Sequence, residues 1–233
     1  FSSDAATIAQ GVISSPLYQA QDTFSRTLSP YDWNPLNLNP LRDLLCDLID
    51  FDAVCRDCAP HLFISATNVR TGKIKVFEDA DLSVDVILAS ACLPTLFQAI
   101  EVDGEAYWDG GFMGNPALYP LFYHAQSDDV IIVHVNPIER EEVPRTASQI
   151  QNRVNEISFN SSLLRELRNV HFVRRLIAEG RLKPGEMKNV LIHSIRDDAT
   201  MAELNVATKL VPEPALFDHL KAAGRSTAEA FLK

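Results

Sequence analysis

The most informative ten residues of this chain are Tyr107-Trp108-Asp109-Gly110-Gly111-Phe112-Met113-Gly114-Asn115-Pro116. They place a carboxylate, Asp109, at the expected end of a β-strand. The glycines after it allow backbone geometry closed to residues with a Cβ, and they let another backbone or a substrate approach closely. Asn115 and Pro116 then match a helix start, with Asn as the N-cap and Pro at the first helical position. The positive dipole end of that helix would favour an ionised, oriented Asp109.

Two other interpretations of these residues are open. Asp-Gly pairs are common in tight turns, where the carboxylate only accepts hydrogen bonds from nearby backbone N–H groups. Residues 110–114 could instead form a phosphate-binding loop between a strand and a helix. That loop would need a Lys or a Ser/Thr after the glycines, and neither follows Gly114. A leading carboxylate would also repel phosphate, so a catalytic or a turn role fits better.

Hairpins are expected on the N-terminal side of Asp109. Residues 61–69 and 73–77 have the pattern of two strands joined by a tight turn. Residues 101–108 have the pattern of a second hairpin, which turns at Asp103-Gly104 and delivers the chain into Asp109.

Elsewhere the sequence predicts strands that alternate with helices. Apolar spacing predicts helices at 41–49, 82–92, 147–160, 163–179 and 215–232. Residues 130–135 are apolar apart from His134, which is typical of a strand buried on both faces of a parallel sheet. A last strand is predicted at 190–195. This alternation indicates an α/β fold with a layered, mostly parallel sheet and helices packed on it.

The composition is that of a globular protein. The 233 residues are 46% hydrophobic, with a mean hydropathy of −0.03, which is enough apolar material for one sizeable core. A single domain over 1–233 is therefore expected. The net charge is −10, and no run of Lys and Arg is interleaved with aromatic residues, so nucleic acid is not expected as a partner.

Neither a metal nor a cofactor is expected. Cys55, Cys58 and His61 could form part of a zinc site, but a fourth ligand with matching spacing is not evident. The six histidines are scattered, with no pair at the helical spacing that binds metals. Ordinary thiols and structural or surface histidines are the simpler interpretation.

The sequence allows peripheral but not integral contact with a membrane. No apolar stretch approaches the ~20 residues needed to cross a bilayer. The predicted helix within 163–183 could lie on a membrane, although a solvated helix face is the simpler interpretation of its pattern. Its apolar face comprises Leu163, Leu164, Leu167, Val170, Val173, Leu176 and Ile177, and its basic residues are Arg165, Arg168, Arg174, Arg175, Arg181 and Lys183. A cytoplasmic or peripheral membrane location is expected.

Several segments resemble the bacterial patatin-like phospholipase family, and the resemblance covers essentially the whole chain. The matching segments are 34–41, Ser65-Ala66-Thr67-Asn68 with Thr71-Gly72, 89–97 (Ala-Ser-Ala-Cys-Leu-Pro-Thr-Leu-Phe), 107–111 and Asn115-Pro116. The resemblance implies the fold of that family, a lipid or ester substrate and no cofactor.

In that family a serine on a Gly-x-Ser-x-Gly elbow attacks an ester carbonyl, and the aspartate of Asp-Gly-Gly or Asp-Gly-Ala acts as its base without a histidine. The resemblance therefore implies that Asp109 is catalytic and that Gly110 and Gly111 form its motif and turn. Backbone N–H groups of a Gly-rich turn would hold the oxyanion. Phe97 and Phe112 are candidates for an acyl pocket, because such sites are mostly apolar and aromatic.

The chain departs from the family pattern at the nucleophile. Neither Gly-x-Ser-x-Gly nor an upstream Gly-rich oxyanion loop occurs in its 233 residues, and Ser65 and Ser90 lack the flanking glycines of an elbow. In the family both elements lie N-terminal to the segments matched here. We therefore expect the chain, which begins at Phe1 rather than at Met, to be the C-terminal portion of a patatin-like hydrolase domain, incomplete at the N-terminal side and inactive alone.

Three functions remain for comparison. The first is a lipid acyl hydrolase with a Ser-Asp dyad, of which only Asp109 is in this chain. The second is a non-catalytic lipid-binding or regulatory relative that has lost the elbow, and the residues preceding Phe1 separate it from the first. The third is an interaction domain with a structural Asp-Gly-Gly turn, which a serine-reactive label would leave unmodified.

Overall fold

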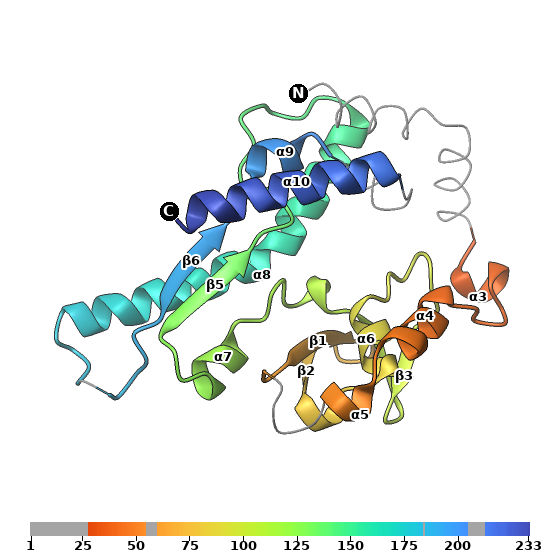
Figure 1. Cartoon of the computed structure of the whole chain (residues 1–233), viewed down its shortest axis with the longest axis horizontal. Helices are drawn as coiled ribbons and strands as arrows, with labels where there is room; N and C mark the ends of the chain where they lie inside the picture. The colour runs from red at the N-terminus through yellow and green to blue at the C-terminus, as the bar shows by residue number, and fades with distance from the viewer. Residues whose placement is uncertain (1–27, 55–59, 184, 205–212) are drawn as a thin grey trace. The chain divides into compact units, whose positions relative to one another are not determined.

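The computed structural model describes residues 28–54, 60–183, 185–204 and 213–233 (Figure 1). The contacts divide the chain into two compact units, which are treated separately. The β1–β4 unit consists of Thr23–His124 and Ser161–Leu167. The β5–β6 unit consists of Phe1–Asp22, Ala125–Asn160 and Arg168–Lys233. The expectation of one domain stays a prediction.

The β1–β4 unit is built on a four-stranded antiparallel sheet, ordered β2-β1-β4-β3. Its strands are β1 (Phe63–Asn68), β2 (Ile74–Glu78), β3 (Ile100–Val102) and β4 (Glu105–Asp109). In the register of this sheet, Ser65 is opposite Val76 and Ala66 is opposite Asp109. β1 and β4 are therefore the central strands, and Asp109 is the last residue of one of them.

Both predicted hairpins of this unit are confirmed. Asn68 Oδ1 holds the β1–β2 turn by accepting hydrogen bonds from the backbone N–H groups of Arg70 (3.1 Å) and Thr71 (2.9 Å). The β3–β4 turn has positive φ at both central residues, 53° at Asp103 and 78° at Gly104. That geometry is the one a two-residue type I′ loop requires, and Asp-Gly is among the pairs that adopt it readily.

Short helices surround this sheet. They are α3 (Pro30–Trp33), α4 (Pro40–Leu48), α5 (Phe51–Val54), α6 (Val84–Ser90) and α7 (Tyr119–His124), with 3-10 turns η1 (Asp79–Asp81) and η2 (Gly110–Phe112). Helix α6 supplies the centre of the core, where its buried Val86 and Leu88 join Phe77 and Tyr107 of the sheet. It begins later than the predicted residue 82 because the Ser83 hydroxyl caps it, accepting from the Val86 N–H.

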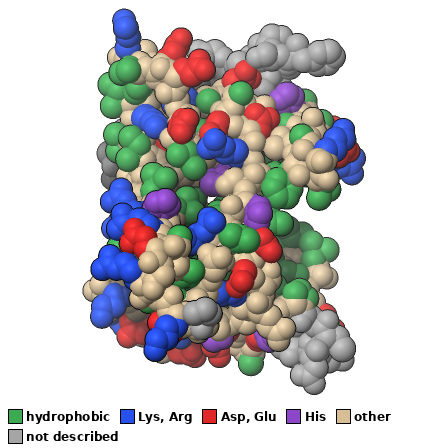
Figure 2. All heavy atoms as spheres, turned by 90° about the vertical axis from the view of Figure 1, so that its left-hand side faces the viewer, with side chains coloured by type: hydrophobic (Ala, Val, Ile, Leu, Met, Phe, Trp, Pro, Cys, Tyr) green, Lys and Arg blue, Asp and Glu red, His purple; other side chains and the backbone are tan. Residues whose placement is uncertain are grey.

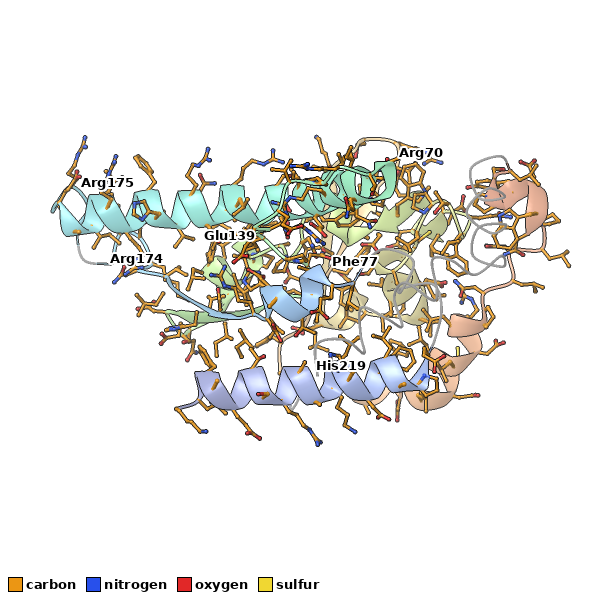
Figure 3. The ribbon with its side chains drawn as sticks, turned by 90° about the horizontal axis from the view of Figure 1, so that it is seen from above. Arg70, Phe77, Glu139, Arg174, Arg175 and His219 are labelled. Atoms are coloured by element: carbon orange, nitrogen blue, oxygen red, sulfur yellow. The ribbon has the colours of Figure 1, made fainter. Side chains whose placement is uncertain are left out.

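Among its described residues, the β5–β6 unit has a two-stranded parallel sheet and three helices. The strands are β5 (Asp129–Val133) and β6 (Leu191–Ile195), and the helices are α8 (Ala147–Ala178), α9 (Asp198–Ala202) and α10 (Pro214–Phe231). Figure 3 shows the two strands between α8 and α10. The predicted last strand and final helix are confirmed.

The prediction that residues 130–135 are buried on both faces is wrong. Val130 and Ile132 are 5% and 3% exposed, whereas Ile131 and Val133 are 55% and 67% exposed. Successive strand residues point to opposite faces. Among the described residues, α8 and α10 leave the face of β5 that carries Ile131 and Val133 largely uncovered.

The two helices predicted at 147–160 and 163–179 are a single helix, α8. Thr146 begins it with a capping box, in which its hydroxyl accepts from the Gln149 N–H and the Gln149 side chain accepts from the Thr146 N–H. No Gly or Pro interrupts residues 147–178, so the serine pair at 161–162 continues the helix.

The predicted helix start at Asn115-Pro116 is also wrong, because these two residues form a turn. Helix α7 begins at Tyr119, with Pro120 in its first turn, where the missing N–H costs no helical hydrogen bond. Glu166 of α8 provides the acceptor at this helix start, taking the Leu118 N–H at 2.8 Å.

The fold is therefore mixed α/β, as predicted, but its larger sheet is antiparallel. A tight turn can join two neighbouring strands only if they are antiparallel. In this sheet, tight turns join β1 to β2 and β3 to β4. The layered, mostly parallel sheet is not seen among the described residues. None of the helices that the structure describes is long and apolar enough to cross a membrane.

Candidate active site at the end of strand β4

Asp109 has a tightly held backbone. Its N–H donates to the Cys92 carbonyl at 2.9 Å, and its own carbonyl accepts from the Thr67 hydroxyl at 2.9 Å. Cys92 lies two residues after the end of α6, and Thr67 lies in β1. The carboxylate therefore projects from a position that two separate elements fix.

The Asp109 side chain is half-buried and begins a turn rather than a long helix. Its Oδ1 accepts from the Gly111 N–H at 2.7 Å, which makes Asp109 the N-cap of η2. A hydrogen bond to an ionised acceptor is stronger than one between neutral groups. The expected helix dipole is replaced by this three-residue turn. Both the catalytic and the turn interpretations include such a bond, so the bond does not choose between them.

Gly110 is required by close packing. It is buried, and a Cβ added there would overlap the Ser65 carbonyl and would lie 2.5 Å from the Ser65 Oγ. The backbone conformation of Gly110 is an ordinary one, so close approach and not positive φ explains the glycine. The sequence predicted this reason for a glycine after Asp109.

Cys92 is not a nucleophile in this arrangement. Burial, together with a smaller effect of the negative charge of Asp109, raises the pKa of its thiol to about 11. Its Sγ donates to the Gln98 carbonyl at 3.2 Å. The group is therefore a neutral thiol near neutral pH, and reactivity of cysteine needs the thiolate.

The two serines of the motifs also lie away from any elbow. Ser65 is inside strand β1, and its hydroxyl is 3.5 Å from the Gly114 carbonyl, at the limit of a hydrogen bond. Ser90 is the last residue of α6. A nucleophile elbow is a sharp strand-to-helix turn, and neither residue occupies one.

The two proposed pocket phenylalanines have different surroundings. Phe97 is half-buried and packs against the core cluster of the β1–β4 unit, a structural role. Phe112 lies in η2 and is 43% exposed, three residues after Asp109. A role in an acyl pocket stays a prediction for both, and the position of Phe112 suits it better.

The candidate metal residues do not form a cluster in the part of the chain that the structure describes. Cys55 and Cys58 lie outside the described residues. His61 Nδ1 is 2.8 Å from Asp79 Oδ2, and this hydrogen bond raises the pKa of His61. An ion pair with Asp79 therefore accounts for His61.

Sequence reasoning missed the contacts that fix the turn. Thr67 is part of the motif Ser65-Ala66-Thr67-Asn68, which was the available sequence signal. Its hydrogen bond to the Asp109 carbonyl, however, depends on how the strands pair. Glu166 gave no signal at all. Its carboxylate accepts from the Leu118 N–H even though burial raises its pKa.

One family comparison bears on this site. The model described as patatin-like phospholipase matches residues 17–122, which include β1 to β4, η2 and Asp109. No curated protein matches the chain. Over residues 17–122, the chain is therefore similar to the patatin-like phospholipase family.

Proposed function

We propose that the chain supplies the base of a serine-dependent lipid acyl hydrolase, and that Asp109 is this base. The observation that carries the proposal is Asp109 itself, a half-buried carboxylate held by backbone contacts at the end of a central strand, inside the family match. An oriented carboxylate in hydrogen-bond reach of a hydroxyl can take its proton. The substrate class is a carboxylic ester of a lipid.

The chemistry needs neither a metal nor a cofactor. Asp109 would accept the serine proton while the serine oxygen attacks the ester carbonyl, and it would then protonate the leaving alcohol oxygen. A water molecule would then attack the acyl-serine ester while Asp109 takes its proton, and Asp109 would return that proton to the serine oxygen as the carboxylic acid leaves. A carboxylate has about four lone-pair sites, so accepting the Gly111 N–H is compatible with this role.

The nucleophile of the proposed dyad lies outside this sequence. No Gly-x-Ser-x-Gly occurs in the 233 residues, and neither Ser65 nor Ser90 lies on an elbow. We place the serine and the oxyanion loop in residues that precede Phe1. Strands of that segment would also complete the layered, mostly parallel sheet that the alternation of strands and helices predicts. The 233-residue chain alone is then inactive, because acyl transfer needs nucleophile, base and oxyanion donors together.

Asp109→Asn in the complete protein tests the proposal. Ester turnover should fall by roughly two to four orders of magnitude, because an amide cannot accept the serine proton. Asp103→Asn makes the same change of charge in the exposed β3–β4 turn and should leave turnover near wild type. Turnover of Asp109→Asn within threefold of wild type, with the fold intact, would remove Asp109 from catalysis.

The missing elbow also favours a second candidate, a non-catalytic lipid-binding or regulatory relative. A fluorophosphonate probe separates the two. Under the first proposal it labels one serine of the complete protein, upstream of Phe1, and leaves the 233-residue chain unlabelled. Stoichiometric labelling of a serine within the 233 residues would contradict the upstream position, and an unlabelled complete protein would favour the second candidate.

A further inference from the structure

The last third of α8 and the loop after it carry an exposed basic surface. We call it the basic end of α8, and all its members belong to the β5–β6 unit. They are Arg168, Phe172, Arg174, Arg175, Arg181 and Lys183, all exposed. Figure 2 faces the side of the molecule where α8 ends and shows Lys and Arg side chains gathered there.

The apolar face that the sequence suggested for membrane contact is largely used inside the protein. Leu163 is 1% exposed and Val170 is 8% exposed, and Val173 and Leu176 are half-buried. Burial in the protein leaves these side chains unavailable to a lipid surface. Any contact made by this end of the helix must therefore use the opposite, exposed face.

That exposed face contains an aromatic ring among arginines. Phe172 is 51% exposed, and the Arg175 guanidinium lies 5.6 Å from the centre of its ring. Arg168, four residues before Phe172, and Arg175, three residues after it, are its neighbours on the helix surface. In Figure 3, Arg175 points from α8 away from the strands, whereas Arg174, at the same end of the helix, lies on its other side.

The local charge has the opposite sign to that of the whole chain. Residues 168–183 contain five basic side chains and one acidic side chain, a net charge of +4, whereas the chain carries −10. The one acidic residue, Glu179, is 3.6 Å from both Arg175 and Arg181. Exposed charges act over a Debye length of about 8 Å at physiological salt. A large flat partner at this face therefore meets positive charge.

We propose that the basic end of α8 docks the protein on an anionic phospholipid surface, with Phe172 entering the headgroup region. Arg168 and Arg175 lie with the exposed Phe172 ring on one helix face, and that combination suits such an interface. A single exposed ring does not provide the successive stacking surfaces that single-stranded nucleic acid uses. The inference deepens the proposed lipid hydrolase and rests on it for the biological substrate, but docking itself requires no turnover.

Vesicle flotation with the full 233-residue chain tests the inference. Binding is measured on phosphatidylcholine vesicles with and without phosphatidylglycerol, and we expect binding only where the anionic lipid is present. Arg168→Glu with Arg175→Glu should weaken that binding at least roughly 25-fold, since each basic residue near the surface contributes about fivefold. Lys221→Glu with Arg225→Glu is the matched control, because it makes the same charge change at exposed positions of α10.

The aromatic contribution has its own matched pair. Phe172→Ala should weaken vesicle binding roughly fivefold, because partial transfer of a phenylalanine side chain out of water is lost. Phe217→Ala on α10 removes a ring that is similarly exposed, at 55%, and should have no effect. Far-UV circular dichroism of each variant verifies that the fold is retained.

Three results would overturn the inference. The first is equal binding to vesicles with and without phosphatidylglycerol. The second is an equal loss of vesicle binding in the α8 variants and in their α10 controls. The third is binding to lipid-free heparin as tight as binding to vesicles, combined with no effect of Phe172→Ala. Asp109→Asn in the complete protein separates the two proposals. This variant should lose turnover but should bind anionic vesicles as wild type does. If the Ser-Asp dyad proposal is wrong, vesicle binding is unaffected. If the docking proposal is wrong, turnover of a soluble ester is unaffected.

Discussion

Gly110→Ala tests the packing beneath the candidate base. The new Cβ would overlap the Ser65 carbonyl oxygen and would lie 2.6 Å from the Ser65 carbonyl carbon, closer than the 3.0 Å that real Cβ contacts respect. Both are backbone atoms of β1. Because β1 is paired with β2 on one side and β4 on the other, it cannot move away without losing sheet hydrogen bonds. The substitution should therefore destabilise the β1–β4 unit.

The size of the effect follows from overpacking. An extra methyl group in a well-packed core costs about 1–3 kcal/mol, and the fixed backbone places Gly110→Ala near the upper end. For a chain of this length, 1 kcal/mol corresponds to about 2–4 °C in Tm, so Tm should fall by roughly 5–10 °C. Trp33 and Trp108 are the two tryptophans, and both belong to the β1–β4 unit, so tryptophan fluorescence reports its melting.

Two controls define the cause. Gly104→Ala adds a Cβ into open space at a φ of 78°, so only backbone strain of about 1–2 kcal/mol is expected. Ser65→Ala combined with Gly110→Ala removes the hydroxyl but not the carbonyl, so it should recover a minor part of the loss. If Gly110→Ala melts no lower than Gly104→Ala, the close approach to Ser65 is not what requires a glycine.

Two further predictions concern carboxylates. Burial raises the pKa of Glu166 in the folded protein above its ordinary value of 4.5. The protonated Glu166 side chain therefore contributes to stability below pH 4.5, and this contribution is lost as the pH rises through the raised pKa of the folded state. The Tm of wild type minus that of Glu166→Gln should therefore fall with rising pH, and a flat difference would contradict the burial argument. Glu156, 12% exposed, lies 2.5 Å from Arg140 and 3.1 Å from Arg153, so Glu156→Ala should cost roughly 2–4 kcal/mol in urea unfolding followed by circular dichroism. Glu179→Ala, which breaks only exposed pairs, should cost under about 1 kcal/mol, and equal losses would contradict this difference.

The elements that the sequence predicted correctly are those with local causes. The hairpin at Asp103-Gly104 needs only two residues that tolerate positive φ, and α10 needs only its apolar spacing. The errors have distant causes. The N–H of Asn115 donates to the Ser162 hydroxyl across 47 residues of sequence, and helix α7 begins where Glu166 supplies its acceptor. Periodicity within a segment cannot show such partners.

In the candidate site too, the features with local causes were predicted and those with distant causes were missed. Asp-Gly-Gly predicted the end of a strand, a close approach at Gly110 and a bond from the turn to Asp109, all of which depend on neighbours in sequence. The contacts of Thr67 and Cys92 with the Asp109 backbone depend on strand pairing and on the end of α6. The parallel, layered sheet was inferred from alternating elements, and alternation does not reveal which strands pair.

The hydrogen bond from Gly111 to Asp109 also shows how a turn role and a catalytic role can be separated. The Asn side chain has a carbonyl oxygen that can accept the same N–H, whereas Ala has none. If Asp109 only holds the turn, Asp109→Asn keeps most of the stability and of any activity, and Asp109→Ala loses about 1 kcal/mol as other missing N-caps do. If Asp109 is the base, Asn and Ala lower turnover by similar large factors although only Ala lowers stability appreciably. Turnover that follows Tm across wild type, Asn and Ala would assign Asp109 to the turn alone.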